Sequence, residues 1–161
     1  MRKPIPGLNL GKAEDFKKAS GFFIDGDEQN GTFIKYHLTG KMALKAKYKN
    51  GEYDGEFTRW DTRGRLEEEF KYKNGNLHGI CTEYRTGGKR YLISRYVDGV
   101  KHGAQEKFYC TRFHYGMKER LDTFEHGILH GDRKGWDHDG LLLIDEVYQN
   151  GIMIINRGIA K

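Results

Sequence analysis

A single pattern recurs along most of this chain: an aromatic residue, one further residue, a turn-forming residue, glycine, three residues, a second glycine and, five positions later, another aromatic residue. The second glycines of successive copies stand 24, 24, 24 and 28 residues apart, at Gly31, Gly55, Gly79, Gly103 and Gly131. A fixed period of this length is typical of repeat architectures, in which each copy folds into the same small unit and buries apolar side chains only against its neighbours. The chain is therefore predicted to be an array of stacked units.

The other positions of the pattern keep the same spacing. Seventeen residues after the second glycine comes a tyrosine, except where four extra residues displace the position to Phe124. Agreement at so many positions indicates that these residues define the repeated unit rather than a site. The predicted structural positions are Tyr48, Gly51, Gly55, Trp60, Tyr72, Gly75, Gly79, Tyr84, Tyr96, Gly99, Gly103, Phe108, Phe124, Gly127, Gly131, Trp136, Tyr148 and Gly151.

The spacing within a copy predicts two β-strands. In the stretch 66–73 mostly apolar positions alternate with charged ones, which is the pattern of a half-exposed antiparallel strand. Glu68 falls on the apolar side, and the sequence offers no reason for it. The aromatic residue at Trp60 marks the preceding strand, Gly64 marks a hairpin loop between the two, and Asn74-Gly75 marks a tight turn after the second. Each copy is therefore predicted to be one β-hairpin.

The predicted fold class is all-β: an elongated single-layer antiparallel sheet of tandem β-hairpin repeats with a period of 24 residues and about eleven or twelve strands. Neighbouring hairpins are expected to stack their aromatic rings into one continuous stripe. Residues 1–20 lack the pattern and are assigned to an N-terminal extension or cap, with a turn or two of helix over 12–20. The array occupies residues 21–161, with Phe22 and Ile24 in its first strand and the apolar residues 152–155 in its last.

Charge and cysteine content narrow the classes of function. The net charge of +5 suits an acidic partner, although lysine and arginine on exposed strands, where they prevent edge-to-edge aggregation, are the simpler explanation. No run is long and apolar enough to span a membrane, and the first residues lead into no signal peptide. Cys81 and Cys110 fall at different points of the repeat, which argues against a framework disulfide and favours a cytoplasmic location.

The repeat resembles that of the MORN (membrane occupation and recognition nexus) family, and it is most similar to the bacterial variant found in YwqK-like antitoxins. The resemblance covers residues 31 to 151 and rests on Tyr48, Asn50, Gly51, Gly55, Trp60, Tyr72, Asn74, Gly75, His78, Gly79, Tyr84 and their later equivalents. It implies a binding scaffold and, for the bacterial variant, one that neutralises a partner toxin. The sequence departs from the family at Asp27, which replaces the leading glycine of the first turn, near Gly116, and over residues 1–20.

The expected function is therefore a non-enzymatic protein-binding scaffold of the antitoxin or immunity type, whose partner is a toxin or a component of a defence system. The alternative is a module that binds a polyanion, either nucleic acid or anionic phospholipid. A group of cations at Lys107, Arg112, Lys118 and Arg120 is a candidate footprint for that alternative.

No metal site, cofactor or catalytic group is predicted. His78, His102 and His130 share one repeat position, but residues on successive hairpins lie about 9–10 Å apart and do not converge on an ion. A polar side chain before glycine is explained more simply by hydrogen bonds to the backbone of the turn. Cys110 and His114 suggest a nucleophile and its base, yet their spacing fixes no hydrogen bond between them, and a free cysteine is more often a packing residue.

The array breaks its period once, because thirteen residues instead of nine separate Gly103 from Gly116. Insertions in repeat proteins map to loops, often on a binding face, and Tyr and Arg are enriched where interfaces bind most strongly. The predicted partner-binding residues are Tyr109, Arg112, Phe113, His114, Tyr115 and Lys118. Arg112 and Tyr115 are expected to anchor the partner. The alternative is a bulged hairpin whose rings fold back onto the sheet.

Overall fold

The protein folds into one open antiparallel sheet of fourteen strands, and among the described residues there is no helix. The structure is a computed structural model that describes residues 21–27 and 29–158, so the predicted extension over residues 1–20 and its helical turn lie outside the described residues. The strands are β1 (Gly21–Gly26), β2 (Gly31–Tyr36), β3 (Met42–Lys49), β4 (Glu52–Trp60), β5 (Leu66–Lys73), β6 (Asn76–Leu77), β7 (Gly79–Arg85), β8 (Lys89–Val97), β9 (Val100–Lys101), β10 (Gly103–Phe108), β11 (Lys118–Glu125), β12 (Ile128–Trp136), β13 (Leu142–Gln149) and β14 (Ile152–Asn156).

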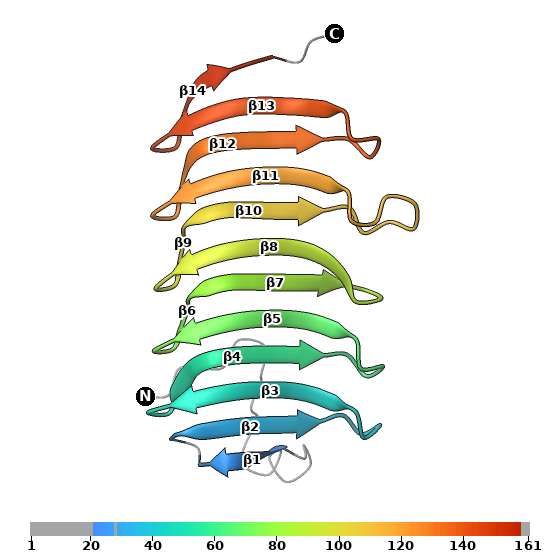
Figure 1. The fold of residues 1–161 in the computed structure, drawn as a ribbon, viewed down its shortest axis with the longest axis vertical. Helices are drawn as coiled ribbons and strands as arrows, with labels where there is room; N and C mark the ends of the chain where they lie inside the picture. The colour runs from blue at the N-terminus through green and yellow to red at the C-terminus, as the bar shows by residue number, and fades with distance from the viewer. Residues whose placement is uncertain (1–20, 28, 159–161) are drawn as a thin grey trace.

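Sequence neighbours pair throughout, so the strands climb the sheet in chain order (Figure 1). The short β6 and β9 pair only with β5 and β8 and are separated from β7 and β10 by His78 and His102 respectively. The predicted fold class, an elongated array of hairpins, is confirmed. From β2 onward, the longer connections lie at one end of the strands, which we call the loop side, and the two-residue turns lie at the other end, the turn side.

The tight turns on the turn side have positive φ at both central residues, for example 47° at Asn74 and 73° at Gly75. This is the type I′ geometry, whose twist matches that of paired strands and which Asn, Asp and Gly adopt at least cost. Each turn is also bonded to the repeat before it: the Gly75 N–H donates to the Tyr53 carbonyl at 2.9 Å. The turns therefore form a hydrogen-bonded stack as regular as the sheet itself.

The residue before each second glycine supports this stack. The Asp54 carboxylate accepts a hydrogen bond from the Asn74 N–H at 3.0 Å, and the His78 ring accepts one from the Asp98 N–H at 3.4 Å. The interpretation of this position as one that satisfies the backbone of a turn is therefore confirmed for these two copies. In these copies a backbone donor of the next turn needs a partner, and a polar side chain before the second glycine supplies it.

From Gly55 onward, the second glycine of the repeat lies in a bulge. Three residues of β4, from Asp54 to Glu56, stand opposite Lys47 alone, because Tyr48 pairs with Tyr53 and Ala46 pairs with Phe57. Gly55 has a φ of 111°, and the stem of Lys47 passes 3.1 Å from the point that a Cβ would occupy. Glycine is required here for its conformation and for the close approach of that side chain.

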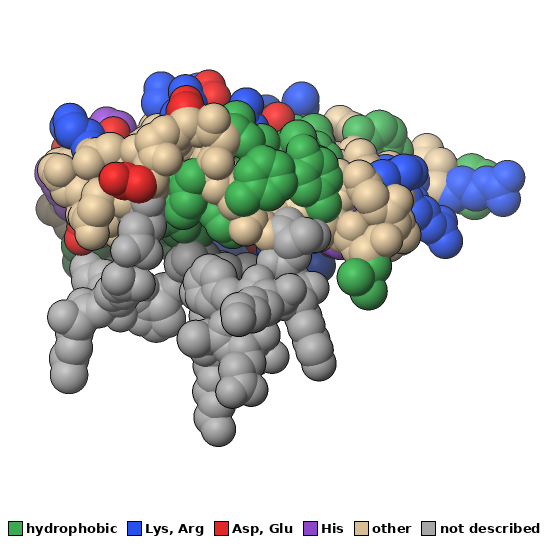
Figure 2. Space-filling view, turned by 90° about the horizontal axis from the view of Figure 1, so that it is seen from below, with side chains coloured by type: hydrophobic (Ala, Val, Ile, Leu, Met, Phe, Trp, Pro, Cys, Tyr) green, Lys and Arg blue, Asp and Glu red, His purple; other side chains and the backbone are tan. Residues whose placement is uncertain are grey.

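The two faces of the sheet differ in character, and we name them after adjacent residues of β3. On the Lys47 face, lysine and arginine side chains project into solvent, whereas the Ala46 face carries most of the buried side chains. Figure 2, which views the molecule from its β1 end, shows charged side chains gathered along one face and hydrophobic ones across the middle. A central row on the Ala46 face holds one residue of each strand of the main path: Phe23, Phe33, Ala46, Phe57, Phe70, Cys81, Ser94, Gln105, Asp122, Arg133, Glu146 and Asn156.

The first half of the Ala46 face contains the aromatic core. Ring contacts run without a break from Phe23 through Tyr48, Tyr53 and Phe57 to Tyr72, with centroids 4.9–5.8 Å apart. Ala46 at their centre is fully buried. A single-layer sheet obtains this burial from its own large side chains, because rings on neighbouring strands cover one another and the small residue between them.

The predicted continuous stripe of rings is wrong beyond Tyr72. Tyr96, Phe124 and Tyr148 occupy the same repeat position in the second half, but among the described residues no ring contact joins them to one another. The aromatics five residues after each second glycine project on the Lys47 face, as the bond from the Tyr84 hydroxyl to Glu69 indicates. The rings therefore divide between two faces, because the bulge and the alternation of each strand separate the two repeat positions.

Candidate partner-binding site on the loop side

The regular loops show what the enlarged loop is built from. Between β4 and β5, the Asp61 N–H donates to the Arg65 carbonyl at 2.8 Å and the Gly64 N–H donates to the Asp61 carbonyl at 2.9 Å. In the enlarged loop between β10 and β11, Tyr109 N–H donates to the Met117 carbonyl at 2.9 Å and the Gly116 N–H donates to the Tyr109 carbonyl at 3.2 Å. The four added residues therefore extend the tip and leave the closing bonds in place (Figure 1).

The tip of the enlarged loop presents aromatic rings to solvent. Phe113 is 83% exposed and Tyr115 is 52% exposed. Arg112 is also exposed, and its guanidinium carbon lies 5.9 Å from the centroid of the Phe113 ring. Phe113 and Tyr115 are therefore not folded back onto the sheet, although the hairpin is bulged between Lys107 and Phe108 and the Tyr109 ring does fold back toward Trp136, as the alternative expected.

Contacts with both neighbouring hairpins hold the enlarged loop. The Lys89 ammonium donates to the Cys110 and Thr111 carbonyls at 3.3 and 3.2 Å. On the other side, the Tyr109 hydroxyl donates to the Trp136 carbonyl at 2.9 Å. The tip is thus carried on a base that is fixed from two directions, which reduces the entropy lost when a partner binds.

The six predicted site residues do not all reach the tip. Lys118 begins β11, and its ammonium lies 2.6 Å from the Glu106 carboxylate. Tyr109 is used at the base of the loop, and His114 lies against the next loop, with its ring centroid 4.7 Å from that of His138. Arg112, Phe113 and Tyr115 are left as the exposed group.

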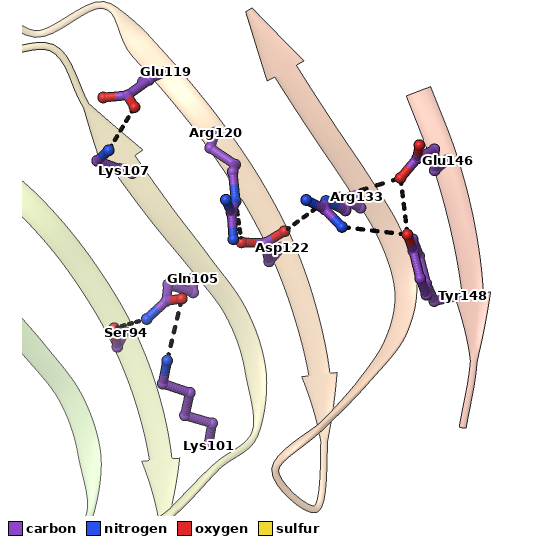
Figure 3. A network of polar contacts seen from close by, with 10 residues as sticks. All are labelled: Ser94, Lys101, Gln105, Lys107, Glu119, Arg120, Asp122, Arg133, Glu146 and Tyr148. Atoms are coloured by element: carbon purple, nitrogen blue, oxygen red, sulfur yellow. Dashed lines mark hydrogen bonds and ion pairs between the residues drawn. The ribbon is translucent and has the colours of Figure 1, made fainter. Parts of the chain in front are cut away.

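The strands beneath the enlarged loop are joined by a polar network on the Ala46 face (Figure 3). Asp122 in β11 is only 2% exposed, and its carboxylate lies 2.5 Å from the Arg120 guanidinium and 3.6 Å from that of Arg133. A buried carboxylate is costly unless cations and hydrogen bonds compensate for lost water. Two arginines therefore hold Asp122 at a position where the first half of the row carries aromatic rings.

Further polar contacts lie along the central row on both sides of Asp122. Toward the first half, the Gln105 amide donates to the Ser94 hydroxyl at 2.8 Å. Toward β14, the Arg133 guanidinium donates to the Tyr148 hydroxyl at 3.2 Å, and that hydroxyl donates to the Glu146 carboxylate at 3.0 Å. Figure 3 shows these contacts as separate groups, one that links β8 with β10 and one that links β11, β12 and β13.

The predicted group of cations is not a patch, which corrects the footprint expected for a polyanion. Lys107 lies 2.5 Å from Glu119, and Arg120 lies 2.5 Å from Asp122. Lys118 is paired as well, and the alternation of β10 and β11 places it on the opposite face from Lys107. Three of the four charges are therefore compensated by acids, and they are divided between two faces.

Cys110 and His114 do not form a nucleophile and base. The Cys110 thiol donates to the Arg90 carbonyl at 3.3 Å, and burial, the largest influence, raises the pKa of that thiol. The His114 Nδ1 atom instead lies 3.1 Å from the Thr111 hydroxyl oxygen. The thiol is thus held in its protonated form, away from the imidazole.

Glu68, unexplained in the sequence, has a cation beside it. The Arg59 guanidinium lies 2.6 Å from its carboxylate, across the pair of β4 and β5. Glu68 and Glu83 line a shallow hollow of about 340 Å³ between neighbouring hairpins. Desolvation raises the pKa of Glu68, Arg59 opposes that shift, and Glu83 adds to it.

The three histidines of the repeat meet different partners. His78 Nδ1 lies 3.2 Å from the Asp98 carboxylate, the His102 ring packs edge-on against His126 at 5.6 Å, and His130 Nδ1 lies 3.5 Å from the Glu125 carboxylate. A different group on the loop side was missed in the sequence. His114, His138 and Asp139 approach one another there. His114 and His138 stand 24 residues apart, and each lies two residues before a loop glycine, Gly116 or Gly140, so the period of the repeat was the signal that could have found this pair.

Neither comparison with known proteins identifies a family for this chain. No protein-family model matches the chain, and no curated protein is significantly similar to it. Within residues 21–27 and 29–158, no helix is long and apolar enough to cross a membrane.

Proposed function

We propose that the protein is a non-enzymatic scaffold that binds a partner protein through the tip of the loop between β10 and β11. The observation that carries this proposal is the exposure of Phe113 and Tyr115 at the one point where the described array breaks its period. Exposed aromatic side chains beside an arginine supply the residue types that dominate protein interfaces. The fixed base of the loop supports the same reading, because a preorganised anchor loses less entropy on binding.

The partner we propose is a toxin or a component of a defence system, and the protein neutralises it by binding, in the cytoplasm. The resemblance of the repeat to that of MORN-type antitoxins is the support for this step. The sheet itself is compatible with it, because a stack of hairpins offers a long rigid surface on which a partner's active groups can be covered.

The first test measures partner capture by the intact chain and by loop variants. The double variant Phe113→Ala, Tyr115→Ala and the single variant Arg112→Ala are expected to lose the partner, with affinity lowered at least tenfold. Leu38→Ala is the matched control, because Leu38 is an exposed apolar residue at the tip of a regular loop. Equal capture by the double variant and the parent, with both folded, would show that the loop is not the binding site.

The second test concerns neutralisation. The captured partner, expressed alone, is expected to arrest growth, and co-expression of the parent chain is expected to restore it. The Phe113→Ala, Tyr115→Ala variant should restore growth less well. A captured partner that is harmless by itself would contradict the antitoxin role and leave the scaffold role to the first test.

A second candidate function is polyanion binding, and one observation favours it. The Lys47 face carries exposed cations on three neighbouring hairpins: Lys45, Lys47, Lys49, Lys71, Lys73 and Arg95. They are distinct from the paired cations near the enlarged loop. Regularly placed charges on an open face can follow a phosphate backbone, and such binding weakens steeply with salt.

Retention of the chain on single-stranded DNA and on vesicles with anionic headgroups, measured against salt concentration, tests this candidate. Lys71→Glu with Arg95→Glu is expected to abolish retention, whereas Arg112→Glu in the enlarged loop should reduce it less. Retention that does not depend on salt, or that the charge reversals leave unchanged, would exclude the Lys47 face as a polyanion site.

A further inference from the structure

Three potential metal ligands meet where the enlarged loop lies against the next loop of the array. His114 comes from the tip between β10 and β11, and His138 and Asp139 come from the loop between β12 and β13. One ligand atom of each residue lies within 4.8 Å of the others. The two imidazole rings are in edge-to-face contact, with an interplanar angle of 81°. His114 and His138 each stand two residues before a loop glycine, Gly116 or Gly140, so the repeat places them in neighbouring loops.

The orientation of His114 suits ligation. Its Nδ1 lies 3.1 Å from the Thr111 hydroxyl oxygen, and the Thr111 oxygen also accepts the His114 N–H at 3.3 Å. A ring whose Nδ1–H is engaged by an oxygen presents the lone pair of Nε2 outward, and this is the usual arrangement of histidines that bind metals. Thr111 is itself fixed through its carbonyl, which accepts from Lys89 at 3.2 Å.

The second loop is equally ordered. The Asp137 carboxylate accepts hydrogen bonds from the N–H groups of Asp139 and Leu141, both at 2.9 Å. These bonds fix the backbone on either side of the ligand pair. The His138 Nε2 lies 3.8 Å from the Asp139 carboxylate, so an imidazole and a carboxylate already stand side by side.

We propose that His114, His138 and Asp139 form a binding site for a divalent transition-metal ion of the zinc class. Two imidazoles and one carboxylate are ligands that suit Zn²⁺, Ni²⁺ and Co²⁺ rather than Ca²⁺ or Mg²⁺. Around Zn²⁺ the ligand atoms would stand about 3.4 Å apart, so each side chain must close by about 1 Å, which side-chain rotation provides at a solvent-exposed site. Three protein ligands leave a fourth position for water or for a group from outside the chain.

A bound ion joins the enlarged loop to the rest of the array. The loop is otherwise held by hydrogen bonds at its base, by the Lys89 ammonium 5.3 Å from the Tyr115 ring centroid and by the contact of the His114 and His138 rings, and the ion adds a coordinate link at His114. This inference does not depend on the proposed function, because the site is built from this chain alone.

The test is titration of ZnCl₂ into the full chain, followed by calorimetry. One equivalent is expected to bind to the parent. His114→Ala and His138→Ala should each lower the affinity more than tenfold, and Thr111→Val, which removes only the group behind the imidazole, should lower it about tenfold. The matched control is the other pair of histidine rings in contact: His102→Ala and His126→Ala, on the turn side, should leave the affinity unchanged.

A second measurement keeps the result independent of folding in the variants. Imidazole NMR signals of the parent chain should shift at one equivalent of Zn²⁺ for His114 and His138 and remain still for His102 and His126. The proposal is overturned if the parent shows no saturable binding, if His114→Ala binds as tightly as the parent, or if the shifted signals belong to the turn-side histidines.

Discussion

At the scale of the residue, one repeat position has different surroundings in the two halves of the sheet. Tyr72 is buried and contacts the rings of Tyr53 and Phe57, with centroids 5.0 and 5.8 Å away. Tyr96, one repeat later, is only partly buried. Its strand, β8, contributes the small polar residue Ser94 to the central row. Two tyrosines at the same repeat position therefore need not contribute equally to the free energy of unfolding.

Tyr72→Ala is expected to lower the free energy of unfolding by about 3–5 kcal/mol, because it removes a buried ring and leaves a cavity among its neighbours. Tyr96→Ala should cost less than half as much. Urea denaturation of both variants at neutral pH checks the difference. Similar losses of unfolding free energy in the two variants would show that the ring contacts of Tyr72 do not stabilise the fold, which would contradict the role given to the aromatic core.

A second prediction at this scale concerns a carboxyl group in a regular loop. Hydrogen bonds from the backbone and the side chain of Arg65 lower the pKa of Asp61 to about 2 from its usual 3.8. The ionised carboxylate therefore favours the folded chain above pH 3.8, and this contribution is lost as the pH falls toward 2. Arg65→Ala should raise that pKa only in part, because the backbone donor remains.

An NMR titration of the Asp61 carboxyl carbon measures this change. The control is Arg63→Ala, because only the backbone N–H of Arg63 contacts the carboxylate, at 2.8 Å. An unchanged midpoint in Arg65→Ala would show that the guanidinium contributes nothing to the shift.

At the scale of the element, each hairpin depends on two kinds of glycine. Gly40 in a loop has a φ of 79° with open space where a Cβ would stand, whereas Gly55 has a φ of 111° and the Lys47 stem beside it. Gly40→Ala should cost about 1–2 kcal/mol for the left-handed conformation alone. Gly55→Ala should cost more, because β4 or Lys47 must also move. Thermal unfolding of the two variants distinguishes them, and equal losses would contradict the role of close approach.

These elements also show how far the sequence predicts the molecule. Hairpin turns at Asn74-Gly75 and its equivalents follow from local chemistry, since positive φ at two successive residues permits few amino acids. The enlarged loop is equally evident from the broken period. The interruptions of the strands at His78 and His102 are not evident from the sequence, because β4 and β12 run through the same repeat position without interruption. The difference depends on how each strand pairs across the bulge, and spacing alone does not carry that information.

At the scale of the whole molecule, the central row changes from aromatic to ionic as it crosses the sheet. The sequence contains this change, but it is invisible until the register assigns Phe57 and Asp122 to one row. The pair of His114 and His138 was open to prediction, because both stand two residues before a loop glycine and one period apart, whereas the approach of the Asp139 carboxylate depends on the folded loop. Periodicity predicts which residues repeat. The register of the paired strands determines which of those residues are in contact.

The two halves should therefore differ in how they open. Local opening of β4 exposes the aromatic core that includes Phe57 and Tyr53, whereas opening of β11 exposes Asp122 and its arginines, which water can solvate. Native-state hydrogen exchange is expected to be slower for amides of β3 to β5 than for those of β10 to β12. Both groups of strands are paired on two sides, so the backbone hydrogen bonds alone predict no difference.

Salt separates the two causes. Raising the ionic strength to about 1 M shortens the Debye length to about 3 Å and weakens the partly exposed ion pairs, while apolar burial is unaffected or strengthened. Exchange should therefore accelerate in β10 to β12 and not in β3 to β5. The variant Asp122→Asn gives the matched comparison, because it removes the anion between Arg120 and Arg133 and should make exchange in β11 less sensitive to salt. If salt changes both halves alike, the ionic part of the row does not stabilise the second half, and the strands beneath the enlarged loop are held by backbone pairing alone.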